Sequence, residues 1–220
     1  MTTKNSTKRS TMDLIFFGMQ GAGKGTLGKS TAAKYGMQIF ETGAELRKLA
    51  SQDSQLAKKV KSIIEAGHLV SNEVVMEIVE NFMNNLQENT PVLFDGIPRK
   101  IEQANSLNAL LDKHNRTYTA VLINISKNTA LSRLTTRRIC KVCKSVYPAD
   151  YKDAKCPSGH DLETRKDDNP EAIETRLNAF ENETKPAIAL YQDKMITIDG
   201  EPHISEAQKL AEQALDPIMA

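Results

Sequence analysis

The amino-acid sequence predicts an α/β fold with a five-stranded parallel sheet flanked by helices. Five short and nearly continuous apolar runs recur along the chain, at residues 13–17, 37–40, 91–95, 119–125 and 195–199. Helix signals fill the segments between these runs, and strands that alternate with helices form a parallel sheet with both faces covered. A glycine-rich loop follows the first run directly and precedes a helical segment.

The loop after the first predicted strand, residues 18–26, reads GMQGAGKGT. Its glycines and Lys24 have the spacing of a Walker A phosphate-binding loop. Glycines let several backbone N–H groups point at one anion, and the following helix presents the positive end of its dipole to the same phosphates. Lys24 can then reach the β and γ phosphates as a point charge. Gly25 occupies the position where a serine or threonine normally ligates Mg²⁺, with Thr26 one residue later, so the loop indicates a subgroup of P-loop proteins.

Two stretches interrupt the alternation of strands and helices. Residues 42–71 are charged and helical, and we expect a helical insert without a strand there. Residues 137–168 hold all three cysteines and two prolines, and they show little helical periodicity. This second stretch is typical of a small irregular module set into the core, of the kind that metal ions stabilise.

The last third of the chain carries two signals for the start of a helix. Asn169 and Pro170 suit an N-cap and a first helical position, and they predict a long helix toward Tyr191. Ser205 and Gln208, three residues apart, form a capping-box pattern that predicts the start of a C-terminal helix.

Four potential metal ligands stand in the second insert, in the order Cys140, Cys143, Cys156 and His160. Zn²⁺ takes four nitrogen or sulfur ligands in a tetrahedron, and two close pairs of ligands can supply them. The odd number of cysteines and the Cys-x-x-Cys spacing favour metal binding over disulfides. We expect a structural site of three cysteines and one histidine, with no open position for water. Asp161 is an alternative fourth ligand, and three reduced thiols without a metal are the other interpretation.

The composition excludes several classes of protein. Of the 220 residues, 29 are Lys or Arg and 28 are Asp or Glu, so the formal net charge is +1. This balance argues against a polybasic nucleic-acid binder. No apolar run approaches the roughly 20 residues that a membrane-spanning helix needs, so we expect no nucleic-acid and no membrane partner. Residues 1–11 are polar and lack the apolar stretch of a secretory signal, which predicts a disordered leader and a cytoplasmic protein.

Several segments match, in order, the motifs of adenylate kinases. Beside the glycine-rich loop, they are FDGIPR at residues 94–99 with Gln103, Thr42-Gly43 with Arg47, GHLV at residues 67–70, Arg137-Arg138, RKDD at residues 165–168, and Arg176-Leu177. From about Leu14 to Pro202 the chain therefore resembles the adenylate kinase family, with Gln20 where proline is usual. The resemblance implies a P-loop nucleotide kinase fold. Its parts would be a core of residues 12–41, 72–136 and 169–220, a monophosphate-binding insert of residues 42–71, and a zinc-bearing lid of residues 137–168.

The resemblance also implies a reaction. The family transfers the γ-phosphoryl group of Mg·ATP reversibly to AMP, giving two ADP. We therefore expect ATP, AMP and ADP as partners, Mg²⁺ and a structural Zn²⁺ as cofactors, and a monomer. Phosphoryl transfer needs positioning and charge neutralisation, and guanidinium groups bind phosphate bidentately while they stay charged. The catalytic residues implied are Lys24, Asp95, Arg99, Arg137, Arg165 and Arg176.

The same resemblance assigns residues to the two nucleotides. Those implied for ATP are Gly21, Ala22, Gly23, Lys24, Gly25, Thr26, Arg133, Arg137, Val146, Tyr147 and Glu201. Those implied for AMP are Thr42, Arg47, His68, Leu69, Val70, Gly96, Ile97, Pro98, Arg99, Gln103, Arg165 and Arg176. Arg133 and Arg137 lie four residues apart, which places both on one face of a predicted helix. Asp95 is expected to order water on Mg²⁺, and Asp167 and Asp168 are expected to be hinge or lid-pairing carboxylates.

Besides Gln20, two residues depart from the family pattern: Ala44 replaces the aspartate usual after Thr-Gly, and Glu41 replaces a small residue before Thr42. Three other functions share some of these features. They are a kinase that uses GTP as donor or UMP or CMP as acceptor, a zinc-ribbon nucleic-acid binder with a P-loop regulatory core, and an inactive homologue. Gln103, whose amide donates and accepts at once, favours adenine. The balanced charge disfavours nucleic acid, and the retained lysine and arginines disfavour an inactive homologue.

Overall fold

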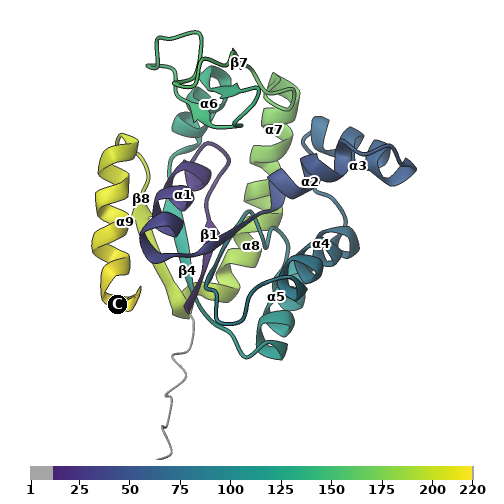
Figure 1. Cartoon of the computed structure of the whole chain (residues 1–220), viewed down its shortest axis with the longest axis vertical. Coiled ribbons are helices and arrows are strands. Elements are labelled where there is room, and N and C mark those ends of the chain that lie inside the picture. Colours follow the sequence, from purple (N-terminus) through teal and green to yellow (C-terminus); the bar gives the residue numbers. More distant parts are fainter. Residues whose placement is uncertain (1–11, 220) are drawn as a thin grey trace, which may run out of the picture.

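The computed structural model describes residues 12–219, and the leader predicted over residues 1–11 lies outside the described residues. Strands and helices alternate along the chain (Figure 1). The strands are β1 (Met12–Phe17), β2 (Gln38–Glu41), β3 (Val92–Asp95), β4 (Thr117–Asn124), β5 (Arg138–Cys140), β6 (Val146–Tyr147), β7 (Leu162–Glu163) and β8 (Met195–Asp199). The helices are α1 (Lys24–Tyr35), α2 (Thr42–Ala50), α3 (Gln55–Glu65), α4 (Asn72–Asn84), α5 (Ile101–Lys113), α6 (Lys127–Thr136), α7 (Pro170–Ala179), the π-helix η1 (Phe180–Thr184), α8 (Lys185–Ile188), the 3-10 helix η2 (Ala189–Lys194) and α9 (Ile204–Met219).

The main sheet is parallel throughout, with the strand order β2-β3-β1-β4-β8. The predicted five-stranded sheet is thus confirmed, and the ends of its strands lie within two residues of the predicted ones. The central strand β1 is fully enclosed, and Leu14, Ile15 and Phe16 are buried. Each such side chain contributes about 1.5–3 kcal/mol by its burial. Because all five strands run the same way, their carboxyl ends meet at one edge of the sheet.

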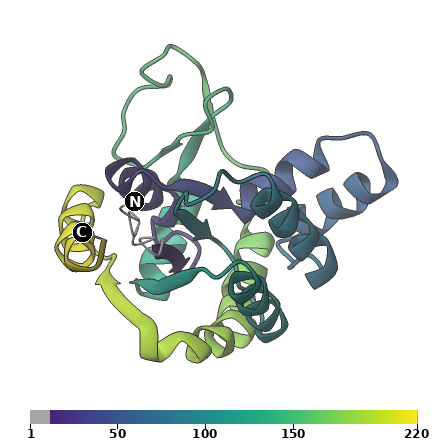
Figure 2. The ribbon, with the colours of Figure 1, turned by 60° about the horizontal axis from the view of Figure 1, so that its bottom comes forward.

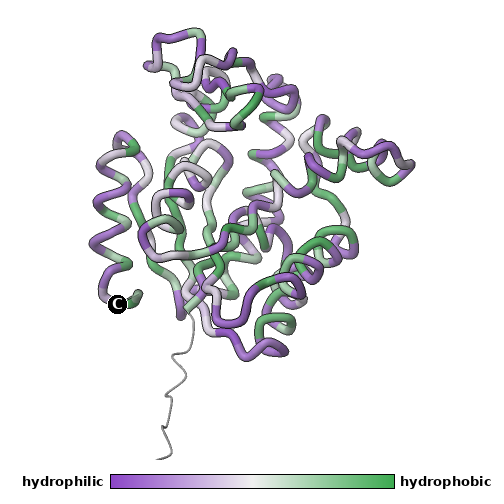
Figure 3. The backbone as a smooth tube through the Cα atoms, viewed as in Figure 1, coloured by the Kyte–Doolittle hydropathy of each residue, from purple (hydrophilic) through white to green (hydrophobic). Residues whose placement is uncertain are grey.

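Helices cover both faces of this sheet, which explains the nearly continuous apolar runs of its strands. Helices α1 and α9 pack on each other at one face, and α4, α5 and α8 pack together at the other (Figures 1 and 2). Hydropathy follows the same layers, since the central strands are apolar and the outer turns of α9 are polar (Figure 3). Within residues 12–219, none of the helices combines the length and the apolar character needed to span a bilayer.

The two predicted inserts extend from the core at the carboxyl edge of the sheet. Helices α2 and α3 form one of them and project to the side, and the segment that carries β5, β6 and β7 forms the other and lies above the sheet (Figure 1). This second insert is more regular than the sequence predicts, because a small antiparallel sheet of order β6-β5-β7 holds it together.

The structure corrects the predicted start of the C-terminal helix. Helix α9 begins at Ile204, one residue before the predicted cap, so Ser205 stands inside the first turn. The carbonyl oxygen of His203 accepts from the N–H groups of Glu206 and Ala207. The imidazole of His203 also lies 2.9 Å from the Ser205 hydroxyl, so it engages the side chain that the capping box would need. The long helix predicted from Pro170 toward Tyr191 is present as α7, η1, α8 and η2 in succession.

Candidate active site

The glycine-rich loop joins β1 to α1 in a conformation that needs glycine at two positions. A Cβ atom at Gly18 would lie 2.6 Å from the carbonyl oxygen of Ile123, and one at Gly21 would lie 2.9 Å from that of Ala130. Gly21 also has a φ angle of 87°, in the left-handed region that L side chains disfavour. The loop therefore packs directly on the backbone at the end of β4 and on α6, which fixes its shape.

Lys24 begins α1 and its side chain folds back over the loop. Its Nζ atom donates to the carbonyl oxygens of Gly18 (2.6 Å) and Met19 (3.1 Å). Burial lowers the pKa of Lys24 to about 8, although the carboxylate of Asp95 acts in the opposite direction. The ammonium group is thus held beside the backbone N–H groups of the loop, where a bound phosphate would raise its pKa again.

Asp95 ends β3 between the two strands that carry the rest of the site. It pairs in register with Phe16 of β1 on one side and with Glu41 of β2 on the other. The residue is buried, and burial raises the pKa of its carboxyl group. A Cβ atom at Gly25 would lie 3.7 Å from its Oδ2 atom, so the missing side chain at this position leaves the carboxylate facing the first turn of α1.

Two adjacent carboxylates, Asp167 and Asp168, tie three arginines together at the base of the second insert. Asp168 is buried and accepts from Arg137 (2.6 and 2.8 Å) and from Arg176 (2.7 Å). Asp167 accepts from Arg165 (2.9 Å) and from Arg176 (3.2 Å). The end of α6, the insert and α7 therefore meet through charge-assisted hydrogen bonds, which are the strong ones.

Arg133 and Arg137 do not share a helix face, contrary to the prediction. Helix α6 ends at Thr136, and Arg137 has an extended backbone (φ −68°, ψ 150°) that directs its side chain to Asp168. Arg133 remains on the helix and donates to the carbonyl oxygens of Gly200 and Glu201, both at 2.9 Å.

Glu201 was predicted to contact ATP, but its side chain contacts the start of α6 instead. Its carboxylate accepts from the backbone N–H of Ser126 and from the hydroxyl of Thr129 at the start of α6. An anion at a helix N-terminus is stabilising. This contact lowers the pKa of Glu201 through its hydrogen bonds with Thr129 and Ser126. The side chain of Glu201 is therefore committed to holding the start of α6.

The loop after β3 and the start of α2 form the opposite half of the site. Gln103 is buried, and its Oε1 atom accepts from the N–H of Arg99 (2.9 Å). The guanidinium of Arg99 donates in turn to the carbonyl oxygen of Gly96 (2.9 Å), and burial lowers its pKa. Thr42, also buried, donates to the carbonyl oxygen of Asp95 (3.2 Å). Arg47 forms an ion pair with Glu41 (3.1 Å).

One continuous cleft of about 1610 Å³ joins these two halves at the carboxyl edge of the sheet. The predicted nucleotide contacts that line it are Gly21, Ala22, Gly23, Lys24, Gly25, Thr26, Thr42, Arg47, His68, Leu69, Val70, Asp95, Gly96, Arg99, Gln103, Arg133, Arg137, Val146, Arg165 and Arg176. Four predicted contacts lie outside this lining: Ile97, Pro98, Tyr147 and Glu201. Ile97 is buried in the core, and the ring of Tyr147 packs 4.6 Å from that of Tyr151.

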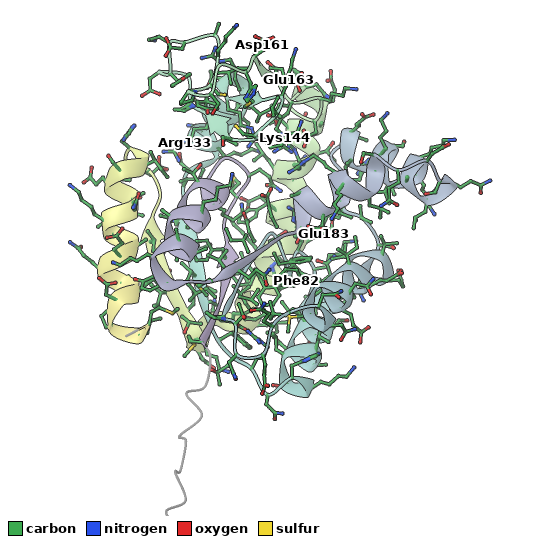
Figure 4. The ribbon with its side chains drawn as sticks, viewed as in Figure 1. Phe82, Arg133, Lys144, Asp161, Glu163 and Glu183 are labelled. Carbon is green, nitrogen blue, oxygen red and sulfur yellow. The ribbon has the colours of Figure 1, made fainter. Side chains whose placement is uncertain are left out.

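The cleft also contains residues that sequence reasoning did not single out. Lys144 of the insert lines the cleft, and it lies between the insert and the core (Figure 4). Its backbone has a left-handed conformation (φ 58°). His203 and Ile204 line it from the start of α9. Nothing in the sequence distinguishes Lys144 from the other lysines of the insert. Gln20 was noted only as a replacement for proline, yet it lines the cleft too, and its Oε1 atom is buried without a hydrogen-bond partner among the described residues.

A cluster of metal-ligating side chains lies in the insert itself. Within residues 12–219, the ligand atoms of Cys140, Cys156 and His160 all lie within 4.8 Å of one another. Cys143 is not one of these three, but its thiol interacts with those of Cys140 and Cys156. Hydrogen bonds, first from Ser145, lower the pKa of Cys143 to about 6. Asp161 is exposed at the top of the insert (Figure 4) and does not belong to the cluster.

The donor set fits a thiolate-binding metal. Burial raises the pKa of the Cys140 thiol, but the backbone nitrogens of Val142 and Cys143, each 3.3 Å from its Sγ atom, act in the opposite direction and favour the thiolate. The Sγ atom of Cys156 lies 3.5 Å from Nδ1 of His160, so the second pair already converges. Sulfur and imidazole ligands in this number suit Zn²⁺.

Comparison with known proteins agrees with this geometry. The profile of the adenylate kinase family matches residues 16–196. An adenylate kinase of Clostridium perfringens (strain SM101 / Type A) is 35% identical over 203 residues, which cover 89% of this chain and 94% of the relative. An adenylate kinase of Staphylococcus aureus (strain Mu50) is 34% identical over 213 residues, which cover 93% of this chain and 99% of the relative. The chain therefore belongs to the adenylate kinase family.

Proposed function

We propose that the protein transfers the γ-phosphoryl group of Mg·ATP reversibly to AMP, giving two ADP. The observation that carries this proposal is the single cleft, which has a phosphate-binding loop in one half and a buried threonine and glutamine in the other. Its volume of about 1610 Å³ exceeds the roughly 300–1,000 Å³ of a site for one small molecule. The cleft therefore has room for a donor and an acceptor nucleotide at once.

The loop half would hold the donor. The backbone of residues 21–26 and the ammonium group of Lys24 suit the phosphates, and Arg133 and Val146 line the same half toward the base. Asp95 would hold Mg²⁺ through bound water, because Mg²⁺ prefers oxygen ligands and keeps several waters. When bound, Mg²⁺ neutralises charge on the phosphates. Gly25 supports this role, since its missing side chain leaves the Asp95 carboxylate accessible from α1.

The other half would hold the acceptor. Arg47, Arg99 and Arg176 line it and can donate to one phosphate, Arg176 through the one N–H of Nη1 that its bonds to Ala172, Asp167 and Asp168 leave over. The Oε1 atom of Gln103 accepts from the backbone N–H of Arg99, so the NH₂ group of Gln103 is left to donate to a ring nitrogen of the base. Thr42 and the backbone of residues 68–70 complete this pocket.

We propose that residues 42–71 act as the monophosphate-binding domain and residues 137–168 as a lid, on a core of residues 12–41, 72–136 and 169–220. Water must be kept from the γ-phosphate, or the enzyme becomes an ATPase. Arg137 and Arg165 sit at the two ends of the lid and line the cleft, so its closure would bring both onto the phosphates. Asp167 and Asp168 form the hinge, because they connect these arginines to α7.

We further propose that Cys140, Cys143, Cys156 and His160 hold a structural Zn²⁺ in the lid. The convergence of three of these ligand atoms and the proximity of the fourth thiol support it. With four protein ligands the metal has no open position, so it would fix the lid's shape. Reduced thiols used for metal binding are typical of the cytoplasm, where we propose that the protein acts as a monomer.

A coupled assay across donor and acceptor nucleotides tests the reaction. We expect ADP formation with ATP plus AMP, in the presence of Mg²⁺, at a rate well above that with GTP as donor or with UMP or CMP as acceptor. A higher rate with one of those alternatives would replace the adenylate assignment with that of another nucleotide kinase. ATP hydrolysis that does not depend on AMP would contradict phosphoryl transfer altogether.

Metal analysis of the purified protein tests the lid. We expect close to one Zn²⁺ per chain, a loss of Zn²⁺ in His160→Ala, and full retention in the matched control Asp161→Ala. Chelation should lower the melting temperature, because the binding energy of a structural site is folding energy. Less than about half an equivalent of Zn²⁺ in the wild-type protein would count against the site.

A further inference from the structure

Glu41 places a second carboxylate at the carboxyl edge of the sheet. It ends β2, pairs in register with Asp95 of β3, and lines the cleft. Burial and, to a smaller extent, the charge of Glu41 raise the pKa of Asp95, so Glu41 acts electrostatically inside the site. It also occupies the N-cap position of α2, yet its side chain makes no capping hydrogen bond. The carboxylate is directed elsewhere.

The partner of this carboxylate is Arg47, one of the arginines proposed to bind the acceptor phosphate. Its Nη2 atom lies 3.1 Å from Oε1 of Glu41, so the side chain of Arg47 turns back along α2 toward the N-terminus of the helix. The guanidinium lies against Gly43, where an added Cβ atom would be 3.0 Å from Nη1. Arg47 therefore lies between the Glu41 carboxylate and the backbone of α2.

We propose that Glu41 lowers the affinity of the acceptor site for phosphate, because it pairs with Arg47 in the ligand-free protein and competes with an incoming monophosphate for that guanidinium. This inference rests on the proposed function of the site. A phosphate dianion and the Glu41 carboxylate compete for the same guanidinium, and the protein gains only the difference between the two interactions. Glu41 thus acts through Arg47 as a positioning residue.

The size of the effect follows from the exposure of the pair. The side chains of Glu41 and Arg47 are 37% and 42% exposed. Ion pairs that are open to solvent are worth little, so the release of Arg47 should change the affinity for AMP by roughly two- to fivefold. The effect should fall on phosphate-bearing acceptors and should spare the nucleoside alone.

The test is Glu41→Gln, with Glu45→Gln as the matched control. Glu45 lies in the first turn of the same helix but outside the cleft lining. Its replacement by Gln makes the same change in net charge without a change in the cleft. We expect Glu41→Gln to lower the KM for AMP by roughly two- to fivefold. The melting temperature and the Kd of adenosine should stay as in the wild type. Glu45→Gln should leave all of these unchanged.

A third variant isolates the route through Arg47. In an Arg47→Ala background, Glu41→Gln should lose most of its effect on the KM for AMP. An unchanged or higher KM for AMP in Glu41→Gln would overturn the inference, and so would an equal gain without Arg47. A wild-type protein that shows no AMP-dependent activity would instead overturn the proposed function, so the two failures are distinguishable.

Discussion

Buried charges stand at both ends of the main sheet, and the two ends satisfy them differently. At the amino edge, Asp13 of β1 accepts from Arg116 through two bonds of 2.6 Å and from the N–H of Val92 (2.8 Å). Arg116 also donates to the carbonyl oxygen of Thr90 (2.7 Å). At the carboxyl edge, Lys24, Asp95 and Arg99 face an open cleft.

The difference separates a charge that holds the fold from charges that await a ligand. Asp13 is fully buried, and burial raises the pKa of its carboxyl group, but Arg116 and the N–H of Val92 act in the opposite direction and supply the partners that its charged form needs. Lys24 has its pKa lowered to about 8 by burial, which means that the ligand-free protein disfavours its charged form. Removal of a charge should therefore destabilise the protein at the amino edge and inactivate it at the carboxyl edge.

The largest expected effect is on stability. Asp13→Ala should lower the free energy of unfolding by about 3–5 kcal/mol, because it leaves the guanidinium of Arg116 buried without its partner. The melting temperature should fall by roughly 6–20 °C. Thermal unfolding measures both changes.

The control for this variant is Asp53→Ala. Asp53 also forms an ion pair, with Lys58 at 3.3 Å, but its side chain is 96% exposed. We expect no measurable change in its melting temperature. Equal melting temperatures for Asp13→Ala and Asp53→Ala would show that the buried pair does not hold the fold.

Lys24→Met should produce the opposite pattern. The loss of one preorganised cation at the transferring phosphoryl group should lower kcat by roughly 10²–10³-fold. The melting temperature should stay the same or rise, since the variant removes a charge that burial opposes. A fall in melting temperature as large as that of Asp13→Ala would break the distinction between the two edges.

Asp168 lies between these extremes, because it is as buried as Asp13 but pairs with arginines of the proposed hinge. Asp168→Asn keeps the shape and removes the charge that Arg137 and Arg176 share. We expect a loss of about 1.5–3 kcal/mol in stability, together with a fall in kcat of up to about 10²-fold from misplaced arginines. Loss of stability with unchanged kcat would make Asp168 purely structural.

The sequence predicts features that depend on neighbours along the chain and misses those that depend on distant ones. The apolar runs of β1 and β3 identify a covered parallel sheet, and the spacing of Lys24 identifies the loop. Nothing local connects Asp13 to Arg116, which lie 103 residues apart. The same reason explains the wrong prediction at Arg137. Its spacing from Arg133 suits one helix face, but α6 ends before Arg137, which pairs with Asp168, 31 residues later.

The smallest expected effect is a proton exchange at Lys24. Its pKa of about 8 in the ligand-free protein should rise when a phosphate binds, because the anion favours the charged form. Binding of ATP at pH 8.5 should therefore take up a fraction of a proton, whereas at pH 6.5 Lys24 is already charged and makes no contribution. Calorimetry in two buffers of different ionisation enthalpy measures this uptake.

Lys24→Met provides the control for the proton exchange, since its remaining titratable groups are those of the wild type. The heat of ATP binding to Lys24→Met at pH 8.5 should be the same in the two buffers, although its affinity for ATP differs from that of the wild type. If Lys24→Met took up as much proton as the wild type, the exchange would belong to another group. The contrast between the two edges of the sheet would then rest on Asp95 and Arg99 alone.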